Sequence, residues 1–514
     1  MHRLVAVWLL LFPMPLFAAP KPNIVVILAD DLGYGDVRYL NPAGKIPTPH
    51  IDRFAAQGVA FTDAHSASSV CSPTRYGLLT GRYCWRTQLT SGVLGGYSDR
   101  LIETGRETIA SVLKKKGYRT ACFGKWHVGM DWTKKDGTTL RSRGNAAIDY
   151  VDQWNVDYTK RIANGPGSVG FDAFFGIAAS LDMPPFAFIE NDAPTEIPTV
   201  DKTWVRTGPA AKSFEAIDVL PTLTKKATEY IAARAKEPTP FFLYLPLASP
   251  HTPILPSKEW QGKSGLNAYA DFTMQTDAAI GEVLDTLQKQ GIADNTLVII
   301  TSDNGCSPQA KFPELKMKGH NPSHIFRGTK ADIYEGGHRV PFLVRWPGHA
   351  KPGVKSDRLV CLNDIFRTCA EVAETTRADD AGEDSFSFLS EIGGAKSDIG
   401  HRTDVVHHSV DGSFAIRDDK WKLCLCPGSG GWSTPRPRRD DSDKLPPVQL
   451  FDMAIDPSET TNRAVQFPEV VERLRKRLQS HVDRGRSTPG TDRKNATKVN
   501  VERAGQAAQK LIPK

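Results

Sequence analysis

The 514-residue sequence has no long apolar run after its first 19 residues, no internal repeat and only eight cysteines. A membrane-spanning helix needs about 20 consecutive apolar residues, so we expect no membrane span in the mature chain. The pair Cys424-x-Cys426 has no second such pair and no histidine nearby, which argues against a structural zinc site there. With 40% hydrophobic and 24% charged residues, the composition is that of a globular protein rather than a disordered one.

The first 19 residues differ from the rest. His2 and Arg3 give a basic start, residues 4–12 form an apolar run, and Ala18-Ala19 is a small-residue end. This pattern predicts a secretory signal peptide over residues 1–19 and therefore a periplasmic or secreted protein. Because no cysteine lies near the expected cleavage site, a lipid anchor has no attachment point there.

The positive charge is concentrated at one end of the chain. The formal net charge is +7, and residues 485–514 contain seven Lys/Arg against two Asp/Glu, so this segment carries five of the seven net charges. We expect it to be a basic, disordered and solvated tail. Attraction of the tail to an anionic polysaccharide is the alternative. A charge confined to the tail does not indicate a nucleic-acid partner.

Four apolar runs rich in β-branched and aromatic residues each end in polar side chains. Runs bounded in this way are typical of strands covered on both faces. They span residues 23–28, 119–123, 241–247 and 297–301, and they are followed by Asp30-Asp31, Lys125-Trp126-His127, His251 and Asp303-Asn304, respectively.

Helical patterns alternate with these runs. Thr104 and Glu107 have capping-box spacing before an apolar stripe that ends at Gly117, and residues 274–290 form a second stripe. Strands that alternate with helices predict an α/β fold with a mainly parallel central sheet sandwiched by helices, here over residues 20–375. Since ligands of such sheets bind beyond the carboxyl ends of the strands, we expect the four polar groups to converge at one edge.

The pattern changes after about residue 375. Residues 404–426 read as short strands around an Asp411-Gly412 turn, which predicts an antiparallel hairpin. A final helix begins near Pro468 and has an apolar stripe of Val471, Leu474 and Leu478. We therefore expect a smaller C-terminal subdomain, an antiparallel sheet plus a helix, over residues 376–484.

The most informative motif is Cys71-Ser-Pro-Thr-Arg75, continued by Gly77-Leu-Leu-Thr-Gly-Arg82. The positive charge of Arg75 would lower the pKa of the thiol or hold an anion. The motif resembles the signature of the formylglycine-dependent sulfatases of the alkaline-phosphatase superfamily. The resemblance implies that a formylglycine-installing enzyme converts Cys71 to an aldehyde during maturation.

Paired oxygen ligands follow two of the predicted strands. Asp30, Asp31, Asp303 and Asn304 offer only oxygen, which suits a hard divalent cation, Ca²⁺ or Mg²⁺, better than zinc. The family resemblance points to Ca²⁺, bound by these four residues and by the modified Cys71.

Further motifs resemble sulfatase elements. They are Gly-Lys125-Trp-His127, Gly-Thr-Lys330 and Glu335-Gly-Gly-His-Arg-Val-Pro341, and in the C-terminal part Leu450-Phe-Asp452 with Asp456-Pro457 and Asn462. His251, which follows Ser-Pro, is assigned to the site because it lies just after the end of a predicted strand. Six histidines match no family position and are left as structural or substrate-rim candidates: His320, His324, His338, His401, His407 and His408.

The resemblance implies hydrolysis of a sulfate monoester by S–O cleavage. The hydrated aldehyde at Cys71 attacks sulfur, with Asp303 as its base, while Ca²⁺, Arg75, Lys125 and Lys330 stabilise the charge on the sulfate oxygens. His251, with Lys330, protonates the departing alcohol, and His127 removes the second hydroxyl proton, which regenerates the aldehyde. Lys125, His251 and Lys330 are also the expected substrate-binding residues.

Three alternative functions remain open from the sequence. A phosphate or phosphonate monoester hydrolase of the same superfamily could use the same nucleophile and metal. A non-catalytic carbohydrate-binding relative would not need the intact catalytic set, and a plain cysteine hydrolase would not need four oxygen ligands.

Two segments are expected to be rim loops whose aromatics stack on sugars: residues 84–87 and residues 181–185. They resemble bacterial exo-sulfatases acting on galactose- or N-acetylgalactosamine-type 6-sulfates. We therefore expect a sulfated carbohydrate, or an aryl sulfate, as the substrate.

Overall fold

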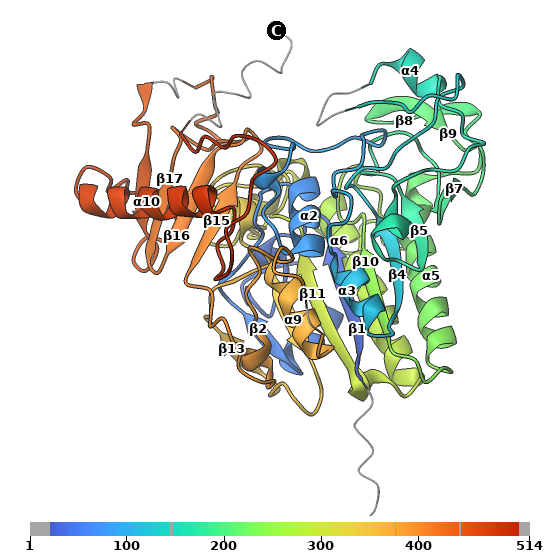
Figure 1. The fold of residues 1–514 in the computed structure, drawn as a ribbon, viewed down its shortest axis with the longest axis horizontal. Helices are drawn as coiled ribbons and strands as arrows, with labels where there is room; N and C mark the ends of the chain where they lie inside the picture. The colour runs from blue at the N-terminus through green and yellow to red at the C-terminus, as the bar shows by residue number, and fades with distance from the viewer. Residues whose placement is uncertain (1–20, 143–147, 376, 441–443, 503–514) are drawn as a thin grey trace, which may run out of the picture.

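A computed structural model describes residues 21–142, 148–375, 377–440 and 444–502 (Figure 1). The predicted signal peptide lies outside these residues. A ten-stranded sheet forms the centre, in the order β13-β2-β12-β11-β1-β10-β4-β5-β6-β7. Its strands are β1 (Asn23–Ala29), β2 (Val59–Phe61), β4 (Arg119–Lys125), β5 (Ala173–Ile177), β6 (Ile189–Glu190), β7 (Ala193–Pro194), β10 (Phe241–Pro246), β11 (Thr296–Ser302), β12 (Phe342–Arg345) and β13 (Val354–Ser356).

The four predicted strands are adjacent and parallel in the middle of this sheet. They correspond to β11, β1, β10 and β4, in that spatial order. Every residue of β1, β10 and β11 is buried, as expected for strands covered on both faces. The predicted α/β class is confirmed, and the carboxyl ends of the four strands lie at one edge.

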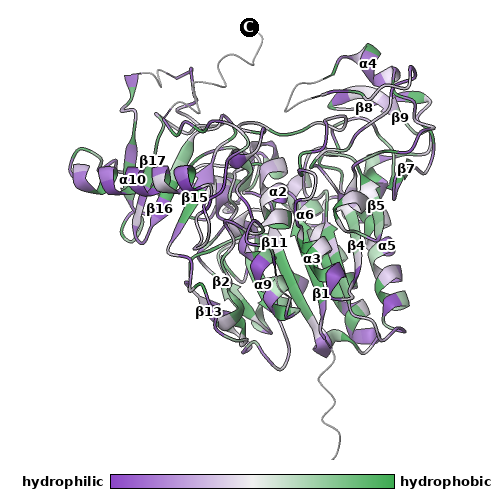
Figure 2. Ribbon diagram, viewed as in Figure 1, coloured by the Kyte–Doolittle hydropathy of each residue, from purple (hydrophilic) through white to green (hydrophobic). Residues whose placement is uncertain are grey.

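Helices cover both faces of the sheet. Successive β1 side chains point to opposite sides, so β1 packs against both layers of helices. Val25 and Ile27 pack with α1 (Pro49–Ala56), α5 (Val219–Arg234) and α6 (Ala268–Lys289). Ile24 and Val26 pack on the other face with side chains from three helices, α2 (Cys71–Thr80), α3 (Ile109–Lys115) and α9 (Asp364–Val372). Figure 2 shows the strands of the sheet as the most hydrophobic part of the ribbon. Among the described residues, no helix is long and apolar enough to span a membrane.

The start of α3 differs from the prediction. Thr108, not Thr104, is the N-cap residue, and its hydroxyl accepts a hydrogen bond from the amide of Ser111. Ser111 in turn bonds back to the Thr108 amide, so serine takes the part that the capping-box pattern assigned to glutamate. The helix is consequently shorter than the spacing indicated.

A second, four-stranded antiparallel sheet follows in the C-terminal part, in the order β15-β16-β17-β18. Its strands are β15 (Asp404–His408), β16 (Phe414–Asp418), β17 (Trp421–Cys424) and β18 (Gln449–Asp452), and α10 (Pro468–Arg484) packs on it. The predicted hairpin and final helix are thus present. Ala381, Phe388 and Ile392, which follow the expected boundary at residue 375, pack in the core of the large sheet.

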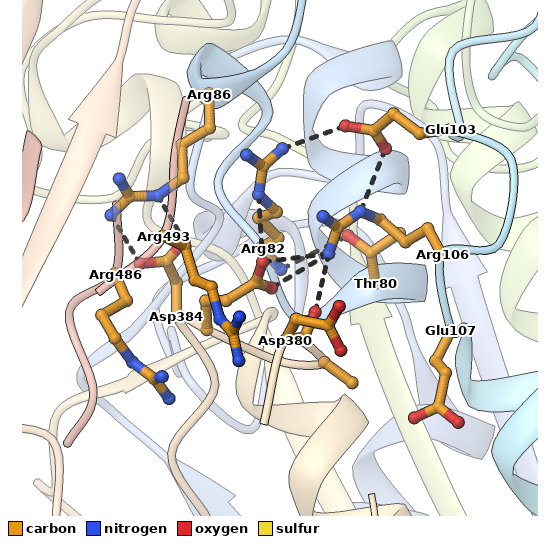
Figure 3. Close-up of polar contacts among 12 residues, drawn as sticks. Thr80, Arg82, Arg86, Glu103, Arg106, Glu107, Asp380, Asp384, Arg486 and Arg493 are labelled. Atoms are coloured by element: carbon orange, nitrogen blue, oxygen red, sulfur yellow. Dashed lines mark hydrogen bonds and ion pairs between the residues drawn. The ribbon is translucent and has the colours of Figure 1, made fainter. Parts of the chain in front are cut away.

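The expected disordered tail is wrong for residues 485–502, while residues 503–514 lie outside the described part. The Arg486 side chain is fully buried, the Ser487 amide donates to Asp384 (3.0 Å), and the Ala496 amide donates to the carbonyl of Arg86 (2.7 Å). Figure 3 shows Arg486 and Arg493 beside the Arg86–Asp384 pair. Both arginines form ion pairs with Asp379, at 3.0 Å and 2.7 Å. Arg486 and Arg493 are therefore held by the Asp379 carboxylate rather than left free in solvent.

Candidate active site

The structure brings all the residues predicted for the site to one edge of the central sheet. Four groups follow the carboxyl ends of β1, β4, β10 and β11, as expected, and the rest come from α2 and from the loop before α8 (Glu335–His338). All are buried: Asp30, Asp31, Cys71, Arg75, Lys125, His127, His251, Asp303, Asn304 and Lys330.

Three ion pairs hold the charged side chains in place. Lys125 Nζ lies 2.6 Å from Asp30 Oδ2, and Lys330 Nζ lies 2.6 Å from Asp31 Oδ1. Arg75 donates through Nη2 to Asp303 Oδ2 (2.7 Å) and through Nη1 to the Lys125 carbonyl (2.9 Å). A buried charge without a partner is costly, so these pairings explain how three carboxylates and three cations share one buried edge.

The donor set fits a hard cation. Asp30 Oδ1 and Asn304 Oδ1 are buried and have no hydrogen-bond partner in the described part of the chain. Asp30, Asp31 and His251 each offer a ligand atom within 4.8 Å of the others. Unsatisfied buried oxygens are rare in folded proteins and call for a ligand, and oxygen donors favour Ca²⁺ or Mg²⁺. The residues present would therefore hold the divalent cation that the sequence predicts.

The carboxylates of Asp30 and Asp303 titrate differently. Burial raises the pKa of both, but the cations Lys125, His251 and Arg75 outweigh it at Asp30 and hold its pKa well below the usual range. At Asp303, burial and the neighbouring Asp30 carboxylate raise the pKa despite the Arg75 ion pair. A divalent cation, when bound by these carboxylates, would favour the ionised form of both.

Cys71 is the first residue of α2, and its thiol is not activated as the sequence suggested. Burial raises its pKa, and Lys125 and Lys330 only partly counter this. The sequence predicts that Arg75 lowers this pKa, but its guanidinium is turned to Asp303 and to the Lys125 carbonyl. The thiol is therefore held protonated, which disfavours a thiolate mechanism.

His127 is poised as a proton acceptor. Its Nε2 lies 2.7 Å from the Leu94 carbonyl, which can only accept, so Nε2 carries the proton and Nδ1 is left as a lone-pair acceptor. Nδ1 has no partner among the described residues. Burial and then the charges of Lys125 and Arg75 lower the pKa of His127 well below its usual value. The imidazole is neutral at physiological pH.

His251 has the opposite arrangement. Its Nδ1 lies 2.5 Å from the Thr252 carbonyl and so carries a proton, while Nε2 lies 3.6 Å from Asp31 Oδ2. Burial and then Lys330 lower the pKa of His251. Its ring also lies at hydrogen-bonding distance from Ser180 Oγ, which accepts from Lys125 Nζ (2.9 Å).

Ser180 is a site residue that was missed in the sequence. It follows β5, the neighbour of β4, and so lies at the same sheet edge. The run Ala-Phe-Phe-Gly-Ile of β5, followed by Ser180, carries the same signal as the four recognised strands. It could have been found by that signal.

One of the two expected rim loops is not at the rim. Trp85 and Arg86 are buried, with Trp85 packed beneath the C-terminal sheet and Arg86 paired with Asp384, so neither can stack on a sugar. The other loop does reach an opening. A cavity of about 320 Å³ is lined by Leu94, Tyr97, Met183, Pro184, Arg206 and Val410, among others. Leu94 joins this cavity to the site, since its carbonyl holds His127.

Comparison with known proteins gives a consistent result. The family described as "Sulfatase" matches residues 22–375. An N-acetylgalactosamine-6-O-sulfatase of Bacteroides thetaiotaomicron is 35% identical, covering 90% of this chain and 93% of the relative. Human arylsulfatase A is 31% identical, covering 90% and 87%. A Bacteroides thetaiotaomicron protein solved in work on the metabolism of multiple glycosaminoglycans superimposes with a TM-score of 0.76 at 33% identity, covering 90% and 99%.

Proposed function

Because the chain belongs to the sulfatase family and is a sulfuric ester hydrolase, we propose that it removes sulfate from a carbohydrate with the help of Ca²⁺ and a formylglycine at residue 71. The observation that carries this proposal is the position of Cys71. It lies at the N-terminus of α2, where the charges of Lys125, Lys330, Asp303 and Asp30 all act on its side chain, and Oδ1 of Asp30 has no partner among the described residues. This arrangement suits a nucleophile that approaches an anionic group.

Each residue has a distinct part in the proposed reaction. Asp30, Asp31, Asp303, Asn304 and the side chain at position 71 would hold Ca²⁺, which when bound stabilises negative charge on the sulfate oxygens. Lys125 and Lys330 add fixed positive charge in a buried site, where such charges act more strongly than in water. Arg75 keeps Asp303 oriented through its two bonds to that carboxylate.

Two histidines would transfer the protons of the proposed reaction. His251, the more exposed of the two imidazoles, would act together with Lys330. It would carry a second proton on Nε2, where the nearby Asp31 carboxylate favours the charged ring, and donate that proton to the alcohol oxygen as the S–O bond breaks. His127 would accept a proton at its unpartnered Nδ1 from the hydroxyl of the modified residue 71. Its Nε2–H is held by Leu94, whose amide donates to Ser72 Oγ (3.1 Å) next to the nucleophile.

The formylglycine can be tested directly. The modification supplies a hydrated aldehyde, whose hydroxyl is the nucleophile. We expect mass spectrometry of the peptide across residues 66–75 to show Cys71 oxidised in active preparations. Full activity from a preparation that contains only the unmodified thiol would contradict the mechanism.

The substrate we propose is a 6-sulfate of N-acetylgalactosamine or galactose. Support comes from the N-acetylgalactosamine-6-O-sulfatase relative and from the cavity beside the site. A panel of defined sulfated mono- and disaccharides should show the highest kcat/KM on 6-sulfates, and 4-sulfates are the matched controls. Activity on an aryl phosphate above that on the aryl sulfate would instead favour the phosphate hydrolase. The sulfatase relatives argue against that alternative.

We also propose export to the periplasm or the medium, on the basis of the signal-peptide pattern in residues 1–19. N-terminal sequencing of the mature protein should begin near Pro20. A mature protein that retains residues 1–19 in the cytoplasm would contradict this.

A further inference from the structure

A second buried cluster of metal-ligating side chains lies away from the active-site carboxylates. His65 is in β3 (Ala64–His65), Glu335 and His338 are in α8, and His407 is in β15. All four side chains are buried, and each offers one ligand atom within 4.8 Å of the others. Two of these histidines, His338 and His407, matched no motif in the sequence.

Each histidine of the cluster has an oxygen acceptor for one ring nitrogen. His65 Nε2 lies 2.8 Å from Asp63 Oδ1, His338 Nε2 lies 3.1 Å from the Ile333 carbonyl, and His407 Nδ1 lies 3.4 Å from the Ser66 carbonyl. A carboxylate or carbonyl that binds the outer N–H is the usual support of a metal-ligating histidine. Where these acceptors take the ring N–H, the other nitrogen is left with a lone pair, although Lys422 also lies 3.0 Å from His338 Nε2 and Arg417 lies 3.3 Å from His65 Nε2.

In this tautomeric arrangement the three remaining nitrogens are all acceptors. His65 Nδ1 and His338 Nδ1 face each other at 3.1 Å, and His407 Nε2 has no partner among the described residues. Two lone pairs at this distance repel unless a cation lies between them. A tetrahedral zinc ion bound at about 2.0–2.1 Å holds its ligand atoms about 3.4 Å apart, close to the 3.1 Å between His65 Nδ1 and His338 Nδ1. The His407 ring stacks on His338 with the centroids 3.6 Å apart, so it would have to turn for its Nε2 to reach the same ion.

The charges around the cluster permit a divalent cation. Burial is the largest cause that lowers the pKa of His65, His338 and His407, so all three are in the neutral form that binds metals. Burial also raises the pKa of Glu335, but Lys422 outweighs it and keeps the group ionised. The nearby cations are balanced, since Lys422, Arg339 and Arg417 pair with Glu335, Glu459 and Asp63.

We propose that His65, His338, His407 and Glu335 bind a divalent transition-metal ion, with zinc preferred. This site is separate from the proposed Ca²⁺ site of the active centre. Three imidazoles and one carboxylate favour Zn²⁺ over the hard cations. The ligands come from the strand that precedes Cys71, the helix that follows Lys330, and the first strand of the C-terminal sheet. The ion would therefore fasten the C-terminal sheet to the two segments that carry active-site residues.

A metal-free network is the competing arrangement. Lys422 Nζ lies 3.0 Å from His338 Nε2 and could donate to it, which would put a proton on His338 Nδ1 for donation to His65. This satisfies the His65–His338 pair but leaves His407 Nε2 without a partner among the described residues. The two arrangements differ in one measurable property, the affinity for zinc.

The test uses the full-length mature protein, equilibrated with micromolar Zn²⁺ in the presence of excess Ca²⁺ and then dialysed. We expect elemental analysis to find about one zinc per chain, and Co²⁺ in place of zinc to give the visible absorption bands of a tetrahedral site. His407→Ala should lose the zinc and keep the calcium. The matched control is His408→Ala, because His408 is the next residue in β15, is equally buried and contacts Phe414 instead of the cluster.

Two results would overturn the proposal. One is a wild-type protein that retains no zinc and gives no Co²⁺ bands. The other is loss of zinc to the same extent in His407→Ala and His408→Ala. If His407→Ala does not fold, the wild-type Co²⁺ spectrum decides alone, since the metal-free network gives no such bands.

Discussion

Asp30 and Asp384 are both fully buried carboxylates paired with basic side chains, yet their surroundings differ. Both oxygens of Asp384 are satisfied, by Arg86 Nε and Nη2 (each 2.8 Å) and by the amides of Tyr83 (2.8 Å) and Ser487 (3.0 Å). Asp30 accepts from Lys125 through Oδ2, but its Oδ1 has no partner among the described residues. A completed network stabilises the fold, whereas an open oxygen is available to a ligand.

The contrast is sharper because one stretch of sequence serves both networks. Arg75 and Arg86 lie 11 positions apart around α2, and both belong to or adjoin the sulfatase signature. Arg75 points into the active site, while Arg86 holds residues of the C-terminal segment, as Figure 3 shows for its pair with Asp384. The beginning of the helix therefore carries the chemistry, and the segment after it anchors the distant end of the chain.

The largest effect is expected at Asp30, whose Oδ1 has no partner among the described residues. Asp30→Ala removes a metal ligand and leaves Lys125 unpaired, so it should abolish Ca²⁺ binding. Because a catalytic metal contributes several kcal/mol to transition-state stabilisation, turnover should fall by about 10³-fold or more. Elemental analysis and kcat on an aryl sulfate check this. Retention of stoichiometric calcium by Asp30→Ala would show that the ligand set is wrong.

The two histidines should separate by substrate. His251→Ala should lose about 10²–10⁴-fold on sugar sulfates, whose leaving groups need a proton, and much less on nitrophenyl sulfate, whose leaving group does not. His127→Ala should instead show, on both substrates, a burst of one alcohol per active chain followed by slow turnover. Equal losses of His251→Ala on the two substrates, with no burst for His127→Ala, would reverse the assignment.

Substitution of Asp384, both of whose oxygens are satisfied, should affect stability rather than chemistry. Asp384→Asn leaves the buried Arg86 without its counterion, and breaking a buried pair in this way costs about 3–5 kcal/mol of the free energy of unfolding. Calcium content and kcat of the folded protein should stay at the wild-type level. Asp379→Asn is the comparison variant, since this carboxylate is 43% exposed and solvent screens its pairs with Arg486 and Arg493, so the loss of stability should be smaller than in Asp384→Asn. Urea denaturation measures the free energy of unfolding of both variants. A large loss of kcat at unchanged stability in Asp384→Asn would show that Asp384 serves the chemistry instead.

The smallest effect concerns acid stability. Burial opposes the charged form of Asp384, but Arg86 outweighs it and lowers the pKa of this carboxyl in the folded protein. As the pH falls, the unfolded chain therefore takes up this proton first, so the stabilisation is complete above about pH 4 and is lost below it. The decline of the unfolding free energy below about pH 4 should be shallower in Asp384→Asn, by about 1.4 kcal/mol for each pH unit that separates the folded and unfolded pKa values. Parallel curves for the two proteins would contradict this.

Much of the fold and the proposed site follows from local pattern. Apolar runs such as residues 23–28 are explained by burial on both faces, and parallel strands bring their carboxyl ends to one edge. The sequence alone therefore places Asp30, Lys125, His251 and Asp303 together, and the sheet order agrees. One prediction failed because a residue's partner lies far away in the chain. Arg486 looked like part of a solvated tail because its partner, Asp379, is more than 100 positions earlier.

The α/β class, the edge at which the site forms and the family follow from the amino-acid sequence, because strand and helix periodicity and the signature around Cys71 are local. Packing of distant segments sets the rest: which buried oxygens have no partner among the described residues, that the Cys71 thiol is not activated, that Trp85 is covered, and that His65, His338 and His407 meet. These outcomes depend on which distant segments pack together, and desolvation and pairing of charge arise only when they do.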